Sequence, residues 1–141
     1  DPDNRRTYPW HRVKYPHVTD FFKMLGELRR SQPVLQRGLL KVLTPMNEDG
    51  SIHQDVFAFQ RCLNEGKDAF DKFLTLSGEA GQSESLICLI NRSIVGKNVR
   101  LEGLKAGLMY SSHRDWSVYT VDENGCLTVS VEDILILKSF G

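Results

Sequence analysis

The chain has 141 residues and no net formal charge, with 40% apolar and 26% charged residues. This balance is typical of one soluble globular domain and excludes a disordered chain, because apolar residues recur along its whole length. No apolar run reaches the ~18–20 residues of a membrane span, and no signal peptide is recognised. Three cysteines without a C-x-x-C pair predict free thiols and an intracellular setting, cytoplasmic or nuclear.

The charges are distributed in blocks. Residues 1–43 carry nine Lys or Arg against four Asp or Glu, whereas residues 44–85 carry three against eight. Blocks of opposite sign can form oppositely charged faces, which favour self-association, or they can neutralise one another inside one monomer. Because the chain begins with Asp and not Met, we also expect it to be a piece of a longer protein.

The first 17 residues combine prolines with basic and aromatic residues and show no helical period. This composition predicts an extended arm at 1–17, followed by a single domain at 18–141. The aromatic side chains would be costly to leave in water, so we expect the arm to dock on its own domain or on a neighbouring molecule. The candidate partner-binding residues are Arg5, Arg6, Tyr8, Trp10, Arg12, Lys14 and Tyr15.

The segments after the arm predict two helices. A Thr-Asp pair at 19–20 can cap a helix that runs to about Ser31, and its apolar residues follow a helical spacing. Pro33 suits the first turn of a second, short helix over 34–43. A glycine inside that segment leaves a strand at 39–43 as the alternative.

The next segment predicts the best-capped helix of the chain. Ser51 and Gln54 have the spacing of a capping box, and an apolar stripe follows over 52–65. We therefore expect Phe59 to lie in the core. A fourth helix is expected at 67–76.

Strand signals dominate from residue 86 onwards. The apolar run at 86–90 indicates a buried strand or the start of a helix, and residues 98–109 favour a strand. The run at 134–137 adds either another strand or a closing helical turn.

A β-hairpin is predicted near the C-terminus. Residues 116–121 and 126–131 flank an Asp-Glu-Asn-Gly sequence, and Asn124-Gly125 favours a two-residue turn. The resulting faces are apolar (Trp116, Val118, Leu127, Val129 and Val131) and polar (Ser117, Tyr119, Thr128 and Ser130). Helices followed by strands predict an α+β fold, in which a helical N-terminal half packs on a small antiparallel sheet that includes the hairpin.

Recognised catalytic motifs are absent from the sequence. It contains no P-loop, dinucleotide-binding, zinc-protease or serine-hydrolase motif, and we predict no catalytic residue, metal site or cofactor. Residues 111–115 bring Ser, His and Asp together, but neighbours in sequence rarely point at one another, so we expect a polar loop. An enzyme whose site only the fold reveals is retained as an alternative.

The sequence therefore predicts a non-enzymatic domain for protein–protein interaction or self-assembly within a larger protein. The expected partner is another protein, a second copy of the chain included, and viral structural proteins often have this make-up. RNA or single-stranded nucleic acid is the alternative partner, because cations in the arm can meet phosphates and aromatics can stack on bases. Further cations for this role are Arg92, Lys97, Arg100 and Lys105, although a pI of about 7.1 places nucleic acid second.

Overall fold

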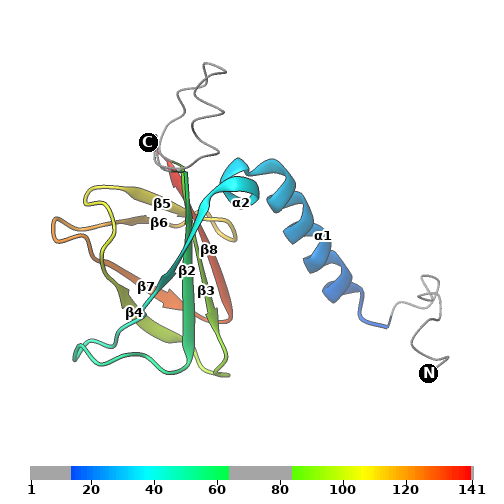
Figure 1. The fold of residues 1–141 in the computed structure, drawn as a ribbon. Coiled ribbons are helices and arrows are strands. Elements are labelled where there is room, and N and C mark those ends of the chain that lie inside the picture. The colour runs from blue at the N-terminus through cyan, green and yellow to red at the C-terminus, as the bar shows by residue number, and fades with distance from the viewer. Residues whose placement is uncertain (1–13, 64–83, 141) are drawn as a thin grey trace, which may run out of the picture. The chain divides into compact units, whose positions relative to one another are not determined.

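The computed structural model of the chain describes residues 14–63 and 84–140 (Figure 1). Two compact units meet in sequence between Gln32 and Pro33. The first contains helix α1 (Pro16–Ser31), which begins at its proline with Tyr15 as N-cap, not at the predicted Thr-Asp pair. Proline suits this first turn because a backbone N–H at that position would have no partner within the helix. The predicted end of this helix at Ser31 is confirmed.

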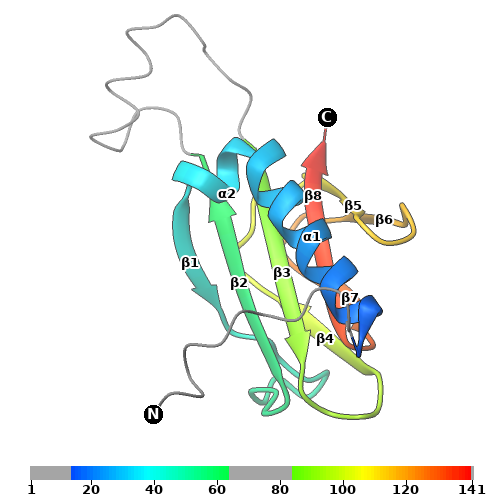
Figure 2. The same ribbon diagram turned by 90° about the vertical axis from the view of Figure 1, so that its right-hand side faces the viewer.

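The second unit is built mainly from strands and forms a β-sandwich. Its elements are α2 (Pro33–Arg37), β1 (Leu39–Leu43), β2 (Val56–Cys62), β3 (Ser85–Asn91), β4 (Lys97–Leu101), β5 (Met109–Ser112), β6 (Val118–Thr120), β7 (Leu127–Val131) and β8 (Ile134–Phe140). Six strands form one sheet in the order β1-β2-β3-β8-β5-β6, and β4 pairs with β7 in a second sheet. Figure 2 shows β1, β2, β3 and β8 side by side. All described strand pairs are antiparallel.

The core lies between the two sheets. Alternate residues of β7 are buried, as expected for a strand with one face against a core. Side chains from both sheets join one apolar cluster, whose largest fully buried members include Tyr110, Ile87, Leu89, Leu101, Leu127 and Leu137. The predicted α+β fold with a helical half is therefore wrong, because strands dominate the described residues and the expected helical half itself contributes β1 and β2 to this sandwich.

The predicted helix over 52–65 is strand β2 in the structure. Ser51 does not cap a helix: its N–H and hydroxyl both donate to Asp49 within a turn. β2 then pairs with β1 on one side and with β3 on the other, and these long-range ladders override the local helical pattern. Phe59 points to the outer face of the sheet and is only half-buried, so its predicted core position is also wrong.

The predicted hairpin is also wrong, because its two strands enter different sheets. β6 pairs with β5, whereas β7 pairs with β4. The turn has three residues, since the Asp122 N–H donates to the Cys126 carbonyl at 2.9 Å. The Asp122 carboxylate accepts the N–H groups of Asn124 and Cys126, which closes an Asx-type turn in which only Gly125 has positive φ.

The other segment predictions divide in three ways. The alternative strand at 39–43 is confirmed as β1, after the short helix α2 that begins at Pro33. Strands are also confirmed within 86–90 and 134–137, and 98–109 contains β4 followed by a loop. The predicted helix at 67–76 lies outside the described residues. Among the described helices, none has the length and apolar content needed to cross a membrane.

The burial of Cys88 predicts how the stability of the fold changes with pH. It lies on β3, and burial raises the pKa of its thiol from 9.0 to about 11. A group with a higher pKa in the folded state stabilises the fold below its unfolded pKa and loses that effect as the pH rises. We therefore expect the Cys88 contribution to the free energy of unfolding to decline between pH 9 and about pH 11.

The measurement is urea unfolding at several pH values for the parent chain and for Cys88→Ala. The variant is expected to lose less stability over this pH range than the parent does. Cys62→Ala serves as the control, because Cys62 is only half-buried. Equal pH dependence in the parent and in Cys88→Ala would mean that the thiol is not desolvated.

Candidate functional site

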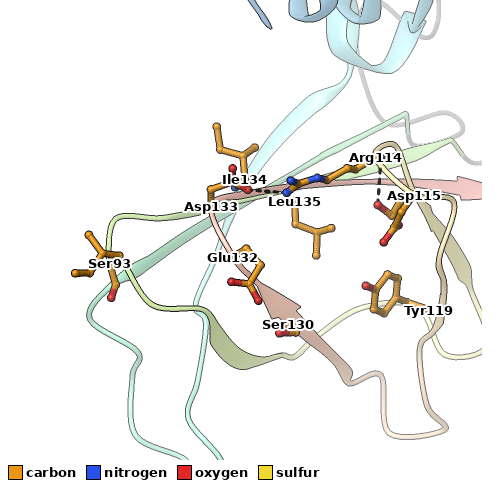
Figure 3. A pocket seen from close by; sticks show the side chains of 11 residues that line it. Ser93, Arg114, Asp115, Tyr119, Ser130, Glu132, Asp133, Ile134 and Leu135 are labelled. Atoms are coloured by element: carbon orange, nitrogen blue, oxygen red, sulfur yellow. Dashed lines mark hydrogen bonds and ion pairs between the residues drawn. The ribbon is translucent and has the colours of Figure 1, made fainter. Parts of the chain in front are cut away.

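An open hollow lies where the two sheets of the sandwich meet (Figure 3). Its volume is about 760 Å³. The two-residue connection between β7 and β8, Glu132-Asp133, carries the chain from one sheet to the other beside it. The lining residues come from four separate segments: Ser93 and Ile94; Ser112, Arg114 and Asp115; Tyr119; and Ser130 with 132–135.

An ion pair spans one side of the hollow. Arg114 Nη1 lies 3.1 Å from Asp133 Oδ1, and Figure 3 shows the arginine reaching across to that carboxylate. Both side chains are about 70% exposed (68% and 72%). Such exposed pairs contribute ~0–1 kcal/mol, so the guanidinium is accessible to a ligand at little cost.

Asp115 is held as a carboxylate by the loop that contains it. Its Oδ1 accepts the Ser117 N–H at 3.1 Å. Hydrogen bonds from the Ser117 backbone and from the Ser112 side chain lower the pKa of Asp115 below its usual value. This residue is therefore an anionic acceptor at neutral pH and not a proton donor.

Trp116 follows Asp115 on the same loop and is an unusual residue. It is the one non-glycine in the described part of the chain with positive φ, at 62°. Its N–H donates to the Ser112 carbonyl at 3.1 Å, and its side chain is 73% exposed. The predicted apolar face shared by the two hairpin strands is thus wrong, since Trp116 and Val118 are exposed whereas Leu127, Val129 and Val131 are buried.

Three polar groups in the hollow have no hydrogen-bond partner among the described residues: Tyr119 Oη, Ser130 Oγ and the Glu132 carboxylate. The Tyr119 ring packs against the core, while its hydroxyl is turned into the space that faces Ser130 and Glu132 (Figure 3). The Glu132 carboxylate lies over Gly96, where a Cβ atom would come within 2.7 Å of both oxygens. Glycine at this position leaves room for the carboxylate.

Most of the predicted partner-binding residues lie outside the described residues: Arg5, Arg6, Tyr8, Trp10 and Arg12. The other two, Lys14 and Tyr15, are exposed, and Lys14 Nζ lies 5.4 Å from the centroid of the Tyr15 ring. Neither residue lines the hollow. Their role in partner binding stays a prediction.

Three of the four cations suggested for nucleic-acid binding have acidic partners. Arg92 and Lys97 both contact Asp55, at 3.6 and 3.8 Å, and Arg100 lies 2.7 Å from Glu102. This pairing reduces the charge that they can offer to phosphates. No group of three or more His, Cys, Asp or Glu side chains in the described ranges is arranged to hold a metal ion.

The sequence prediction missed the hollow, although one signal for it existed. Tyr119 and Ser130 were both assigned to the polar face of the expected hairpin, and both line the hollow. Arg114 and Asp115 were assigned to a polar loop, which is also correct. What could not be foreseen is that the chain brings these segments together with the turn at 132–133.

β-sandwich domains occur in many proteins of unrelated function, so the fold alone does not define what this domain does. No family model matches the chain. The amylopullulanase of Thermoanaerobacterium thermosulfurigenes is 34% identical over 105 residues, which are 74% of this chain and 5% of that protein. The amylopullulanase of Thermoanaerobacter thermohydrosulfuricus is 32% identical over 134 residues, 93% of this chain and 8% of its own length.

Solved structures of α-amylases share the fold. An α-amylase from Anoxybacillus aligns with 99% of this chain and 25% of its own chain, at a TM-score of 0.65 and 22% identity. The α-amylase of Geobacillus thermoleovorans, solved with acarbose, aligns with all of this chain and 26% of its own, at a TM-score of 0.64 and 22% identity. The chain thus spans a small part of each relative.

These findings overturn the predicted function. The relatives are amylopullulanases, and the structures with this fold are α-amylases, so the chain is similar to a small part of several glycoside hydrolases. The prediction of a self-assembly or viral structural domain is wrong. Its bases were the blockwise charge, the missing motifs and the aromatic arm, and none of these distinguishes an assembly domain from one part of a large enzyme.

Proposed function

We propose that this chain forms a β-sandwich within a larger enzyme that hydrolyses α-glucans, and that the sandwich serves this enzyme without supplying its catalytic carboxylates. The observation that carries the proposal is the similarity of 93% of the chain to only 8% of an amylopullulanase. The name of that relative states action on amylose-type glucans and on pullulan. A chain that matches so small a part of such a protein leaves ample length elsewhere for a catalytic site.

The chemistry of the hollow supports the second half of the proposal. Glycoside hydrolysis commonly uses two carboxyl groups, one of which is a general acid whose pKa is raised by its surroundings. In the hollow, the pKa of Asp115 is lowered by hydrogen bonds within its turn, and Asp133 pairs with Arg114. These carboxylates are arranged to accept hydrogen bonds and not to deliver a proton.

The test is an assay of reducing-sugar release from soluble starch and from pullulan by the purified 141-residue chain. We expect no release above that of a heat-denatured sample. Release that is lost on substitution of Asp115 or Glu132 would contradict the proposal, because it would place the catalytic carboxylates in this chain.

A further inference from the structure

We propose that Asn124 is a site of spontaneous deamidation, in which its side-chain amide is lost as ammonia, and that the turn over residues 122–126 controls the rate of this reaction. The modification is independent of the proposed function. Asparagine is one of the residues that are chemically labile in proteins. Asn124 differs from the other described asparagines in the residue that follows it and in the turn that holds it.

The reacting groups belong to two adjacent residues. Asn124 is exposed, and its side-chain amide has no hydrogen-bond partner among the described residues. Gly125 has no side chain, so no substituent on its Cα shields its backbone nitrogen from the amide carbon. The other described asparagines are followed by Glu48, Arg92 or Val99, each of which has a side chain at that place.

The reaction needs only water as co-reactant. The deprotonated backbone nitrogen of Gly125 attacks the side-chain carbonyl carbon of Asn124, so that a new C–N bond forms and the bond to the amide nitrogen breaks. The amide nitrogen takes up the proton that the backbone lost and leaves as ammonia, and a cyclic succinimide remains. Water then opens this ring at either carbonyl carbon. One opening gives aspartate, and the other gives isoaspartate, whose main chain runs through the side-chain carbon atoms.

The folded turn withholds the attacking nitrogen. The Gly125 N–H donates to the Asp122 carbonyl at 3.1 Å, and the Gly125 carbonyl accepts the Leu104 N–H at 3.0 Å. The Asp122 carboxylate also accepts the N–H groups of Asn124 and Cys126, at 2.9 and 2.8 Å. The nitrogen can lose its proton and approach the amide carbon only when these bonds open, so the rate follows the local opening of the turn.

The isoaspartate product does not fit the closed turn. It adds one carbon atom to the main chain between positions 124 and 125, where Gly125 is buried and a Cβ atom would come within 2.7 Å of the Leu104 carbonyl oxygen. The aspartate product keeps the length of the main chain and adds only a third carboxylate, next to Asp122 and Glu123. Formation of isoaspartate therefore weakens the turn that joins β6 to β7.

The test is incubation of the purified 141-residue chain at neutral and at mildly alkaline pH, followed by mass spectrometry of the intact chain and of its peptides. We expect conversion of the amide to an acid at Asn124 before any other described asparagine. The conversion should be faster at the higher pH, because the attacking nitrogen must be deprotonated, and faster in guanidinium chloride, which opens the turn. An Asn124 that stays intact, or equal rates with and without denaturant, would overturn the proposal.

Matched variants test the control by the turn. Asp122→Ala removes the carboxylate acceptor and should speed the deamidation of Asn124 by about tenfold, the effect on the opening equilibrium of losing a hydrogen bond to a charged group. Glu123→Ala removes the same charge from an exposed neighbour that makes no hydrogen bond with any described residue, and should leave the rate unchanged. Asp122→Asn keeps an oxygen acceptor and should stay close to the parent. Equal rates in Asp122→Ala and Glu123→Ala would contradict control by the turn.

The aged chain tests the effect on stability. Circular dichroism shows whether each variant is folded, and the comparison with denaturant uses the parent chain alone, so it decides the question even if Asp122→Ala does not fold. Separated by chromatography, the isoaspartate form is expected to melt below the parent chain. Asn124→Asp, which has the aspartate product at normal main-chain length, should melt close to it. Equal melting temperatures of all three forms would refute the expected weakening of the turn.

Discussion

Leu137→Ala is expected to lower the free energy of unfolding by about 2–5 kcal/mol, the range for a leucine removed from a packed core. Leu137 is fully buried on β8, between Ile87 of β3 and Ser112 of β5, and belongs to the cluster that joins the two sheets. The cavity left by the substitution cannot collapse easily, because β8 has a paired strand on each side. Urea unfolding followed by circular dichroism measures the loss.

Leu40→Ala is the matched control for this prediction. It makes the same chemical change on β1, an edge strand, where Leu40 is 59% exposed. Its expected cost is below ~1 kcal/mol, because surface substitutions rarely exceed about half that value. Similar losses for the two variants would show that the sandwich core does not lie between the two sheets as described.

Gly125→Val is expected to cost about 2–5 kcal/mol, from strain of ~1–2 kcal/mol and overpacking of ~1–3 kcal/mol. Gly125 has φ of 76°, which a β-branched residue adopts only with strain. A Cβ atom there would also come within 2.7 Å of the Leu104 carbonyl oxygen. The same turn joins the strands that carry Tyr119 and Ser130, so the substitution should disturb the hollow as well.

Gly107→Val separates the two causes. Gly107 has the same φ of 76°, but nothing lies within 4 Å of a Cβ atom built on it. Its expected cost is therefore the strain of ~1–2 kcal/mol alone. Thermal unfolding of both variants gives the comparison, and equal melting temperatures would show that the Leu104 backbone yields without cost.

Local signals in the sequence predicted those elements that depend on neighbouring residues. Pro33 correctly marked a helix start, and the alternation over 127–131 correctly predicted a strand with one buried face. β2 was mistaken for a helix because Ser51 and Gln54 mimic a capping box, while its strand partners lie far away in sequence. The ladders that decide its structure are not visible in a local window.

The candidate site could be predicted only in pieces. Tyr119 and Ser130 were placed on one polar face, but the face was assigned to a hairpin that does not form. Arg114 and Asp133 are 19 positions apart. They meet because β5, which ends just before Arg114, lies beside β8, which begins just after Asp133. The polar residues of the hollow could therefore be named from the sequence, but the strand order that brings them together could not be predicted from it.

The most direct test of the proposed function is an assay of the longer protein that contains residues 1–141. Purified from its complete coding sequence, it should be incubated with soluble starch and with pullulan, and the reducing sugar released should be measured over time. The account predicts hydrolysis of at least one of these α-glucans by the longer protein, at a rate far above that of the 141-residue chain. A correctly folded longer protein that hydrolyses neither would contradict the assignment of this sandwich to an α-glucan hydrolase.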